Sequence, residues 1–232
     1  MIIGIMQPYF FSYIGYWQLL NAVDEYVVYD DVNYIKNGWI NRNRILVNGE
    51  PSFFNLQLIN ASPNKKINEI KLNKSDYFTR KNIKTIELAY KKAPYFNDIF
   101  PLIVKILNDP TEQLSTYIYN SILSINDYLN INTKIIMSSQ IEKNNDLKGQ
   151  DKVIEICKKL KGTEYYNAIG GIELYDKAIF QENGIQLSFV QSNSIEYNQF
   201  NNDFVPNLSI IDVLMFNSRD QIYQMLNAYR LI

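Results

Sequence analysis

Short apolar runs alternate with helical patterns near the start of the chain. Residues 2–6 (IIGIM) form a continuous apolar run that stops before Pro8, which is typical of a strand buried on both faces. Residues 15–23 carry one apolar stripe at helical spacing, and a β-branched and aromatic run follows at 26–29. This order predicts a strand, a helix and a second strand.

The same alternation returns in the second half of the chain. Apolar strand patterns recur there, separated by helical patterns of ten or so residues that end at glycine or Asn-Gly pairs. Such an alternation predicts right-handed βαβ units and a parallel, Rossmann-like α/β sheet of about five strands. The predicted strands are 134–139, 165–169 and 185–190, and the predicted helices are 150–161, stopping at Gly162, and a segment opened by Gly170-Gly171 and closed by Asn183-Gly184.

Two segments interrupt this pattern. Asn48-Gly49 between two extended apolar runs predicts a hairpin excursion over 46–58. Residues 76–130 form a helical insertion or cap, with helices expected at 76–92, 96–107 and 111–130 and with Thr111 as an N-cap. We interpret residues 1–232 as a single α/β domain that contains both.

The remaining segments are two terminal helices and one loop. Ser209 with Asp212, and Ser218 with Gln221, have the spacing of capping boxes and predict the starts of the two helices. The polar segment 139–150 is expected to be a mobile loop.

Composition narrows the class of protein. The chain is 47% hydrophobic and 20% charged, as globular proteins are, and its net charge is −1, so it has no global field for nucleic acid or an anionic membrane. The N-terminus lacks a signal-peptide pattern, and no run reaches the roughly 18 apolar residues of a membrane span. We therefore expect a cytoplasmic protein that has no membrane span and does not bind nucleic acid.

The chain contains no histidine. This excludes Ser-His-Asp and Cys-His mechanisms, a histidine base and a histidine-ligated zinc. Any proton transfer falls to Asp, Glu, Lys, Tyr or water. The single cysteine, Cys157, lies in an amphipathic pattern and is expected to be a buried structural thiol.

Ligands of open parallel sheets bind beyond the carboxyl ends of the strands. This rule selects the segments 7–15, 30–44, 138–149, 167–171 and 191–207. In the first, Gln7 brings an amide to the end of a strand, and Tyr9, Tyr13 and Gly15 follow among crowded aromatics. These aromatics either line a cleft or cap the end of the sheet, and both interpretations stay open.

The segment 30–44 combines acids, arginines and an indole. Two guanidinium groups and two amides around Trp39 suit a phosphate or carboxylate on a ligand with a flat or sugar face. Asp30 and Asp31 are the candidate catalytic residues, as a base for a hydroxyl or amine or as metal ligands, and the alternative is a structural ion pair with Arg42 or Arg44. The substrate-binding candidates here are Lys36, Trp39, Asn41, Arg42, Asn43 and Arg44.

Two later segments add weaker candidates. In "NAIGG", Asn167, Gly170 and Gly171 form a strand-to-helix turn whose N–H groups could cradle an anion, although glycine pairs at turns are common for backbone reasons alone. In 191–207 the candidates are Glu196, Gln199 and Asn207.

Four motifs resemble the WbqC-like protein family: "QPYFFSYIGYW" (7–17), "WINRNRI" (39–45), "YYNAIGGIELY" (165–175) and "FVPNLSIIDVLMFN" (204–217). The resemblance implies a bacterial protein of surface-polysaccharide or O-antigen assembly. This sequence departs from the family pattern at two places. It has Ser12 where the family usually has proline, so a looser turn is expected here. It also lacks the histidine that many members carry shortly before the position of Tyr197. The binding residues that the resemblance transfers are Gln7, Tyr13, Gly15, Trp39, Asn41, Arg42, Asn43, Gly170, Gly171, Asn207 and Asp212.

The opening strand, proline turn and glycine-started helix are also similar to nucleotidyltransferase-like (HUP-like) ligases such as pantothenate synthetase. Those enzymes use histidines that are absent here, so the likeness concerns the fold and does not give function.

Three functions remain open from the sequence. The first is a transferase of surface-glycan assembly that moves an acyl or aminoacyl group to a sugar amine, with Asp30 or Asp31 as proton acceptor. The alternatives are a metal-dependent glycosyltransferase and a non-catalytic sugar-nucleotide binder. The expected partner is a small sugar substrate, and the cofactor is left open among a nucleotide, a nucleotide sugar and acyl-CoA. No metal site is assigned, and the many tyrosines suggest a homodimer.

Overall fold

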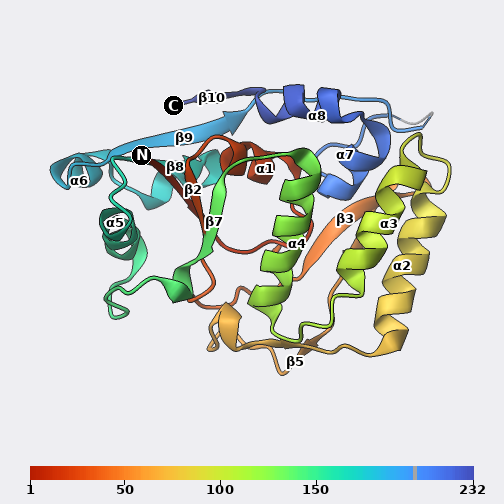
Figure 1. Ribbon diagram of the computed structural model, residues 1–232, viewed down its shortest axis with the longest axis horizontal. Coiled ribbons are helices and arrows are strands. Elements are labelled where there is room, and N and C mark those ends of the chain that lie inside the picture. The colour runs from red at the N-terminus through yellow and green to blue at the C-terminus, as the bar shows by residue number, and fades with distance from the viewer. Residues whose placement is uncertain (201–202) are drawn as a thin grey trace.

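A six-stranded, mostly parallel sheet forms the centre of the computed structural model, which describes residues 1–200 and 203–232 (Figure 1). The strand order is β10-β9-β8-β1-β2-β7, and all neighbours pair in parallel except β10, which runs antiparallel to β9. The mostly parallel α/β architecture is therefore confirmed. The strands are β1 (Ile2–Met6), β2 (Glu25–Val28), β7 (Lys134–Met137), β8 (Glu164–Ala168), β9 (Gln186–Ser192) and β10 (Tyr229–Leu231).

The edge strand β10 was not predicted. It is three residues long, and two of them are exposed, so it carries no hydrophobic alternation of its own. Its place comes from pairing with β9, in which Arg230 lies opposite Gln191.

Helices cover both faces of the sheet. On one face, Ile3 and Phe189 pack with α5 (Gly149–Lys159) and α6 (Lys177–Glu182), and Cys157 is buried there as expected. On the other face, Tyr26 and Val190 pack with α1 (Ile14–Asn21) and α8 (Arg219–Leu226). Because β1 lies between β8 and β2, it needs apolar side chains on both faces, as its sequence has.

The helical insertion consists of α2 (Asp76–Tyr90), α3 (Phe96–Leu107) and α4 (Leu114–Leu129). Its buried side chains belong to the same apolar cluster as Tyr26. The prediction of Thr111 as N-cap is wrong, because α4 begins at Leu114. Thr111 instead donates its N–H to Asp109 Oδ1 at 2.8 Å, in a turn that precedes the helix.

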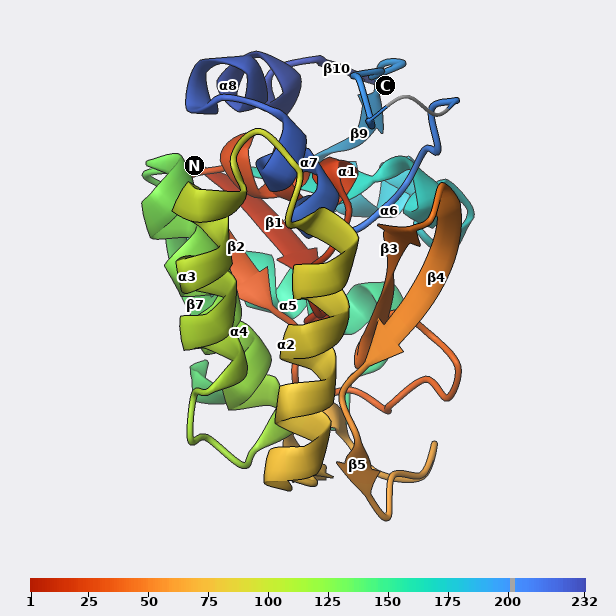
Figure 2. The same cartoon turned by 90° about the vertical axis from the view of Figure 1, so that its right-hand side faces the viewer.

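The hairpin consists of β3 (Arg42–Val47) and β4 (Glu50–Asn55) and lies beside α2 (Figure 2). Both turn residues have positive φ, 53° at Asn48 and 83° at Gly49, as a type I′ turn requires. The hairpin begins at Arg42 rather than at residue 46, which corrects its predicted bounds. Arg42 and Arg44 therefore lie on one face of a strand, and Asn43 is buried on the other.

The capping predictions have different outcomes at the two terminal helices. The capping box at the start of α8 is confirmed, with reciprocal bonds between Ser218 and Gln221. At α7 (Ile210–Phe216), Ser209 Oγ accepts from the Ile211 N–H, but Asp212 turns inward instead of completing a box.

Several connections are short. Gly170 and Gly171 lie in a 3₁₀ turn, η3 (Ile169–Leu174), so the expected α-helix begins only at α6, with Asp176 as N-cap. The other short elements are β5 (Leu58–Ile59), β6 (Lys71–Leu72), η1 (Ile67–Glu69) and η2 (Ser138–Gln140). Among the helices of residues 1–200 and 203–232, none has the length and apolarity needed to cross a bilayer.

Candidate functional site

The site is built around a strained turn between β1 and α1. Phe11 has φ 44°, a left-handed conformation that is costly for a bulky side chain. Its carbonyl accepts hydrogen bonds from Asn43 Nδ2 and Ser209 Oγ, both at 2.8 Å. Two segments distant in sequence thus hold the turn in a conformation that it would not adopt alone.

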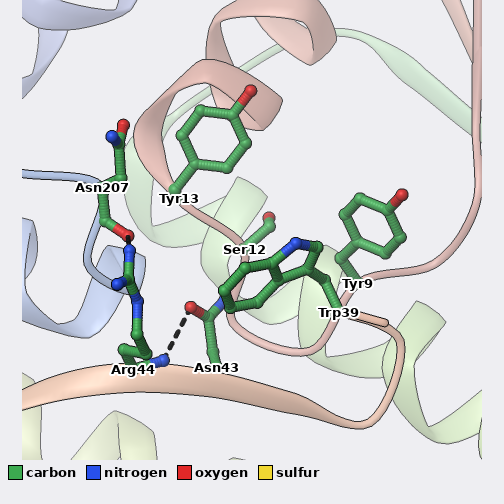
Figure 3. A pocket seen from close by; sticks show the side chains of 7 residues that line it. All are labelled: Tyr9, Ser12, Tyr13, Trp39, Asn43, Arg44 and Asn207. Carbon is green, nitrogen blue, oxygen red and sulfur yellow. Dashed lines mark hydrogen bonds between the residues drawn. The ribbon is translucent and has the colours of Figure 1, made fainter. Parts of the chain in front are cut away.

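A cavity of about 380 Å³ opens beside this turn. Figure 3 shows Arg44 extending from β3 toward Asn207, with Trp39 and the two tyrosines around Ser12. Every lining residue except Ser12 was a candidate from the sequence. The lining residues are Tyr9, Ser12, Tyr13, Trp39, Asn43, Arg44 and Asn207.

Two polar atoms at the cavity lack partners. Arg44 Nε and Ser12 Oγ are both buried, and neither has a hydrogen-bond partner among the described residues. Arg44 is held by Nη2, 3.4 Å from the Asn207 carbonyl oxygen, and its guanidinium lies 5.6 Å from the Trp39 ring centroid. Buried donors without partners are rare in folded proteins, so this pair indicates a place for an acceptor.

The expected looser turn at Ser12 is not what the structure shows. The Ser12 carbonyl accepts from Trp17 Nε1 at 3.2 Å and from the Ile210 N–H at 2.9 Å, and the residue is only 1% exposed. Its backbone is fixed, and its buried hydroxyl has no hydrogen-bond partner in the described part of the chain.

The tyrosines of the cavity are protonated donors. Burial raises the pKa of Tyr13, and burial together with the neighbouring Tyr13 raises the pKa of Tyr9. Gly15 is required beneath Tyr13, because a β-carbon there would lie 2.5 Å from the Tyr13 ring. The glycine therefore lets the ring cover the first turn of α1.

Three neighbouring candidates make their hydrogen bonds within the protein. Asn43 donates to the carbonyls of Phe10 and Phe11 and accepts from the Arg44 N–H, although it also lines the cavity. Asn41 accepts from Tyr34 and donates to the Leu56 carbonyl. Arg42 donates to the carbonyls of Gly38 and Asn37 and lies over Phe53, and it does not belong to the cavity lining.

Comparison with known proteins assigns the chain to a family. The model of the WbqC-like protein family matches residues 7–224. The protein belongs to this family. The uncharacterized protein Rv1507c of Mycobacterium tuberculosis is 26% identical to it over 218 residues, which cover 93% of each chain. No solved structure matches the chain.

The family assignment agrees with the motifs, and the fold explains three of them. Segments 7–17, 39–45 and 204–217 of this WbqC-like protein meet at the cavity through Ser12, Arg44 and Asn207. The fourth segment, 165–175, lies along β8 and η3, and the cavity lining does not include it.

The two candidate catalytic acids of the WbqC-like chain lie outside the cavity lining. Asp30 is fully buried and accepts from both the N–H and the hydroxyl of Ser139, at 2.9 and 2.6 Å. Asp31 Oδ2 lies 3.0 Å from Lys143 Nζ and 2.9 Å from Lys152 Nζ. Asp31 thus pairs with two lysines rather than with Arg42 or Arg44.

The charge of Asp31 is stabilised by these partners. Burial by itself would raise the pKa of Asp31. The neighbouring Ser138, Lys152 and Lys143 lower this pKa by more than burial raises it, so it lies below the ordinary 3.8. Lys143 also donates to the Ser138 and Ile141 carbonyls, which ties down part of the segment 139–150 that the sequence indicates to be mobile.

The other candidates are dispersed. Gln7 contributes its carbonyl to the Tyr16 hydroxyl, and Lys36 is exposed. Asn167 accepts from the Ala168 N–H, and its amide lies against Gly171, whereas space is open around Gly170. None of these residues lines the cavity.

Gln199 and Asp212 belong to a buried network behind the site. Asp212 accepts from the Tyr90 and Tyr197 hydroxyls and from Gln199 Nε2, at 2.7–2.8 Å. Gln199 also bonds to both the N–H and the carbonyl of Val205. The network therefore fixes the end of the segment 191–207, of which residues 201 and 202 lie outside the described part.

Sequence reasoning missed Ser12, Lys143 and Lys152. Ser12 was noted only as a departure from the family pattern, and that departure was itself the available signal. Lys143 lies in a polar run and Lys152 in an amphipathic helix, where a buried lysine has the same sequence pattern as an exposed one.

Proposed function

We propose that this protein binds a nucleotide-linked amino sugar in the cavity and transfers an acyl or aminoacyl group to the sugar amine during bacterial surface-glycan assembly. The observation that carries the proposal is a pair of buried atoms, Arg44 Nε and Ser12 Oγ, that have no hydrogen-bond partner within residues 1–200 and 203–232. A phosphate group offers an acceptor oxygen to each of them, and a guanidinium group binds phosphate with paired, charge-assisted hydrogen bonds.

The aromatic walls support a sugar as the neighbouring group. Trp39 offers a flat indole face, and Tyr9 and Tyr13 offer neutral hydroxyl donors. The volume of about 380 Å³ is within the range of small-molecule sites, roughly 300–1,000 Å³. A sugar phosphate fits this combination of one charged donor group and apolar ring faces.

The proposed chemistry needs no histidine. The sugar amine attacks the carbonyl carbon of a thioester such as an acyl-CoA; the N–C bond forms, the C–S bond breaks, and the amine proton ends on the departing thiolate. None of the lining residues is a carboxylate. Positioning therefore supplies the main effect, and Asp30 and Asp31 act by holding the ends of β2 and β7.

The proposal includes three further expectations. The reaction takes place in the cytoplasm, and the mostly parallel sheet, with a cavity lined by residues that follow β1, supports a nucleotidyltransferase-like (HUP-like) fold. The exposed aromatics Tyr77 and Tyr223 support a homodimer, which light scattering on the purified protein tests. No specific observation favours the metal-dependent glycosyltransferase, since Asp31 binds two ammonium groups and Asp30 binds Ser139.

The test compares Arg44→Gln with Arg42→Gln. Both residues lie on the same face of β3, but only Arg44 lines the cavity, whereas both hydrogen bonds of the Arg42 guanidinium go to the carbonyls of Gly38 and Asn37. Calorimetry with amino-sugar 1-phosphates and nucleotide sugars should show binding weakened about 10-fold or more in Arg44→Gln, because a hydrogen bond to a charged group contributes about 1.5–3 kcal/mol. Arg42→Gln should bind within about 2-fold of the parent.

Mass spectrometry with acyl-CoA donors then tests transfer. Formation of the N-acyl sugar nucleotide supports the proposed reaction. Equal affinity of the parent and Arg44→Gln would refute the site. Arg44-dependent binding without product across the donor panel would instead support a non-catalytic binder.

A further inference from the structure

A second cavity adjoins the first and shares Asn207 with it. Its volume is about 490 Å³, and it is bounded by the segment after β9, by Ile14 and by residues 204–208. Asn207 has φ 56°, so the chain reverses at the wall between the two cavities. Ser12 and Tyr13 face the first cavity and Ile14 faces the second.

The wall between the cavities has positive character from two sources. Helix α1 begins at Ile14 with no side-chain cap and no acid in its first turn, so no side-chain charge within the helix offsets the positive end of its dipole. The Arg44 guanidinium reaches the same wall at the Asn207 carbonyl, 3.4 Å away. Ser12, which is 1% exposed, precedes the helix and lines the first cavity, and its hydroxyl has no partner among the residues that the structure describes.

The second cavity also has one acid, and its chemistry differs from that of the first cavity. Glu196 lines it and makes no hydrogen bond or ion pair within the described part of the chain. The rest of the lining combines apolar side chains such as Ile14 and Val213 with serine hydroxyls. A carboxylate beside an apolar slot is suited to a ribose diol attached to a base, as in dinucleotide sites where an acid binds the ribose hydroxyls.

We propose that the second cavity holds the nucleoside half of the ligand, with Glu196 accepting hydrogen bonds from the ribose hydroxyls and the diphosphate crossing the wall over the start of α1. A nucleoside diphosphate sugar has two ring systems joined by an anionic bridge, and the two cavities with a positive wall between them match this division. This inference rests on the proposed function in one respect, namely that the first cavity holds the sugar phosphate.

The test uses calorimetry with two kinds of probe. The first is a panel of ribonucleoside diphosphates with their 2′,3′-dideoxy counterparts, and the second is glucosamine 1-phosphate. Glu196→Gln should weaken the ribonucleoside diphosphate that binds best by about 10-fold. It should leave the dideoxy counterpart and glucosamine 1-phosphate within about 2-fold of the parent.

Glu173→Gln is the matched control, an exposed acid on η3 that should leave all affinities unchanged. Equal binding of ribonucleoside diphosphates by the parent and Glu196→Gln would overturn the inference, as would a panel in which none binds. In both cases Arg44-dependent binding of glucosamine 1-phosphate would still support the first cavity as the sugar-phosphate site. Glu196-dependent nucleotide binding without sugar-phosphate binding would support the second cavity and refute the proposed function.

Discussion

Replacing Asp31 by asparagine should destabilise the protein strongly. The two lysines on Asp31 Oδ2 have side chains only 1% and 5% exposed, and the Asp31 side chain is 5% exposed. Loss of the carboxylate would leave two buried ammonium groups without their counter-charge. Removing one partner of a buried pair costs about 3–5 kcal/mol, which is about 6–20 °C of melting temperature for a chain of this size.

The effect should depend on pH in a defined direction. Because the pKa of Asp31 in the folded protein lies below 3.8, the folded state holds fewer protons at this site than the unfolded state, and ionised Asp31 stabilises the fold. The difference between the parent and Asp31→Asn should be constant at neutral pH. It should shrink as the pH falls below 3.8 and Asp31 of the parent becomes protonated.

Urea denaturation followed by circular dichroism measures both effects. Glu87→Gln is the matched control, because its bond to Lys84 has the same 2.9 Å length but lies between exposed side chains, so it should change the free energy of unfolding by less than about 1 kcal/mol. Adding Lys152→Met to Asp31→Asn should restore part of the loss, because it removes one unpaired ammonium group.

An Asp31→Asn protein as stable as the parent would refute this reasoning. If a stable Asp31→Asn protein had also lost turnover, the result would support Asp31 as the proton acceptor of the reaction. Loss of turnover only in proportion to unfolded protein would agree with a structural role.

Two smaller predictions concern packing and the buried network. Gly171→Ala should lower the free energy of unfolding by about 1–2 kcal/mol in thermal melts, because its β-carbon would lie 2.4 Å from Asn167 Nδ2. Gly170→Ala is the control and should be neutral or slightly stabilising, because space is open around Gly170. Equal melting temperatures of the two variants would contradict this packing. Burial raises the pKa of Asp212 above 3.8 despite its three donors, so its ionised form costs stability, and its contribution improves as the pH falls toward 4. Tyr197→Phe should therefore cost about 1–3 kcal/mol at neutral pH and less once Asp212 is protonated, and denaturation with the same loss at every pH would contradict this sign.

The sequence predicted those parts of the fold that depend on local pattern. The run IIGIM specifies a strand buried on both faces, and Asn48-Gly49 specifies its turn, because side-chain alternation and positive φ are properties of neighbouring residues. The five parallel strands follow from the same periodicity. The bounds of β3 could not be predicted from this periodicity, because its first three residues, Arg42–Arg44, are polar and show no apolar alternation.

The candidate site could be predicted in part for a similar reason. Tyr9, Trp39 and Arg44 have unusual chemistry in segments that a parallel sheet brings to one edge, and all three line the cavity; their role in binding stays a prediction. Ser12 has no such signature, and its importance comes from lining the same cavity as Arg44 with a buried hydroxyl that has no partner in the described part of the chain.

Side-chain pairing was decided only by the tertiary structure. The sequence placed Asp31 near arginines, and the fold gave it Lys143 and Lys152, which lie more than a hundred residues away in the chain. Whether a carboxylate acts as a base or as a structural ion depends on which groups surround it and on how much water reaches it. Local patterns determine the strand that carries Asp31, but only the packing of distant segments determines its neighbours and thus its charge environment.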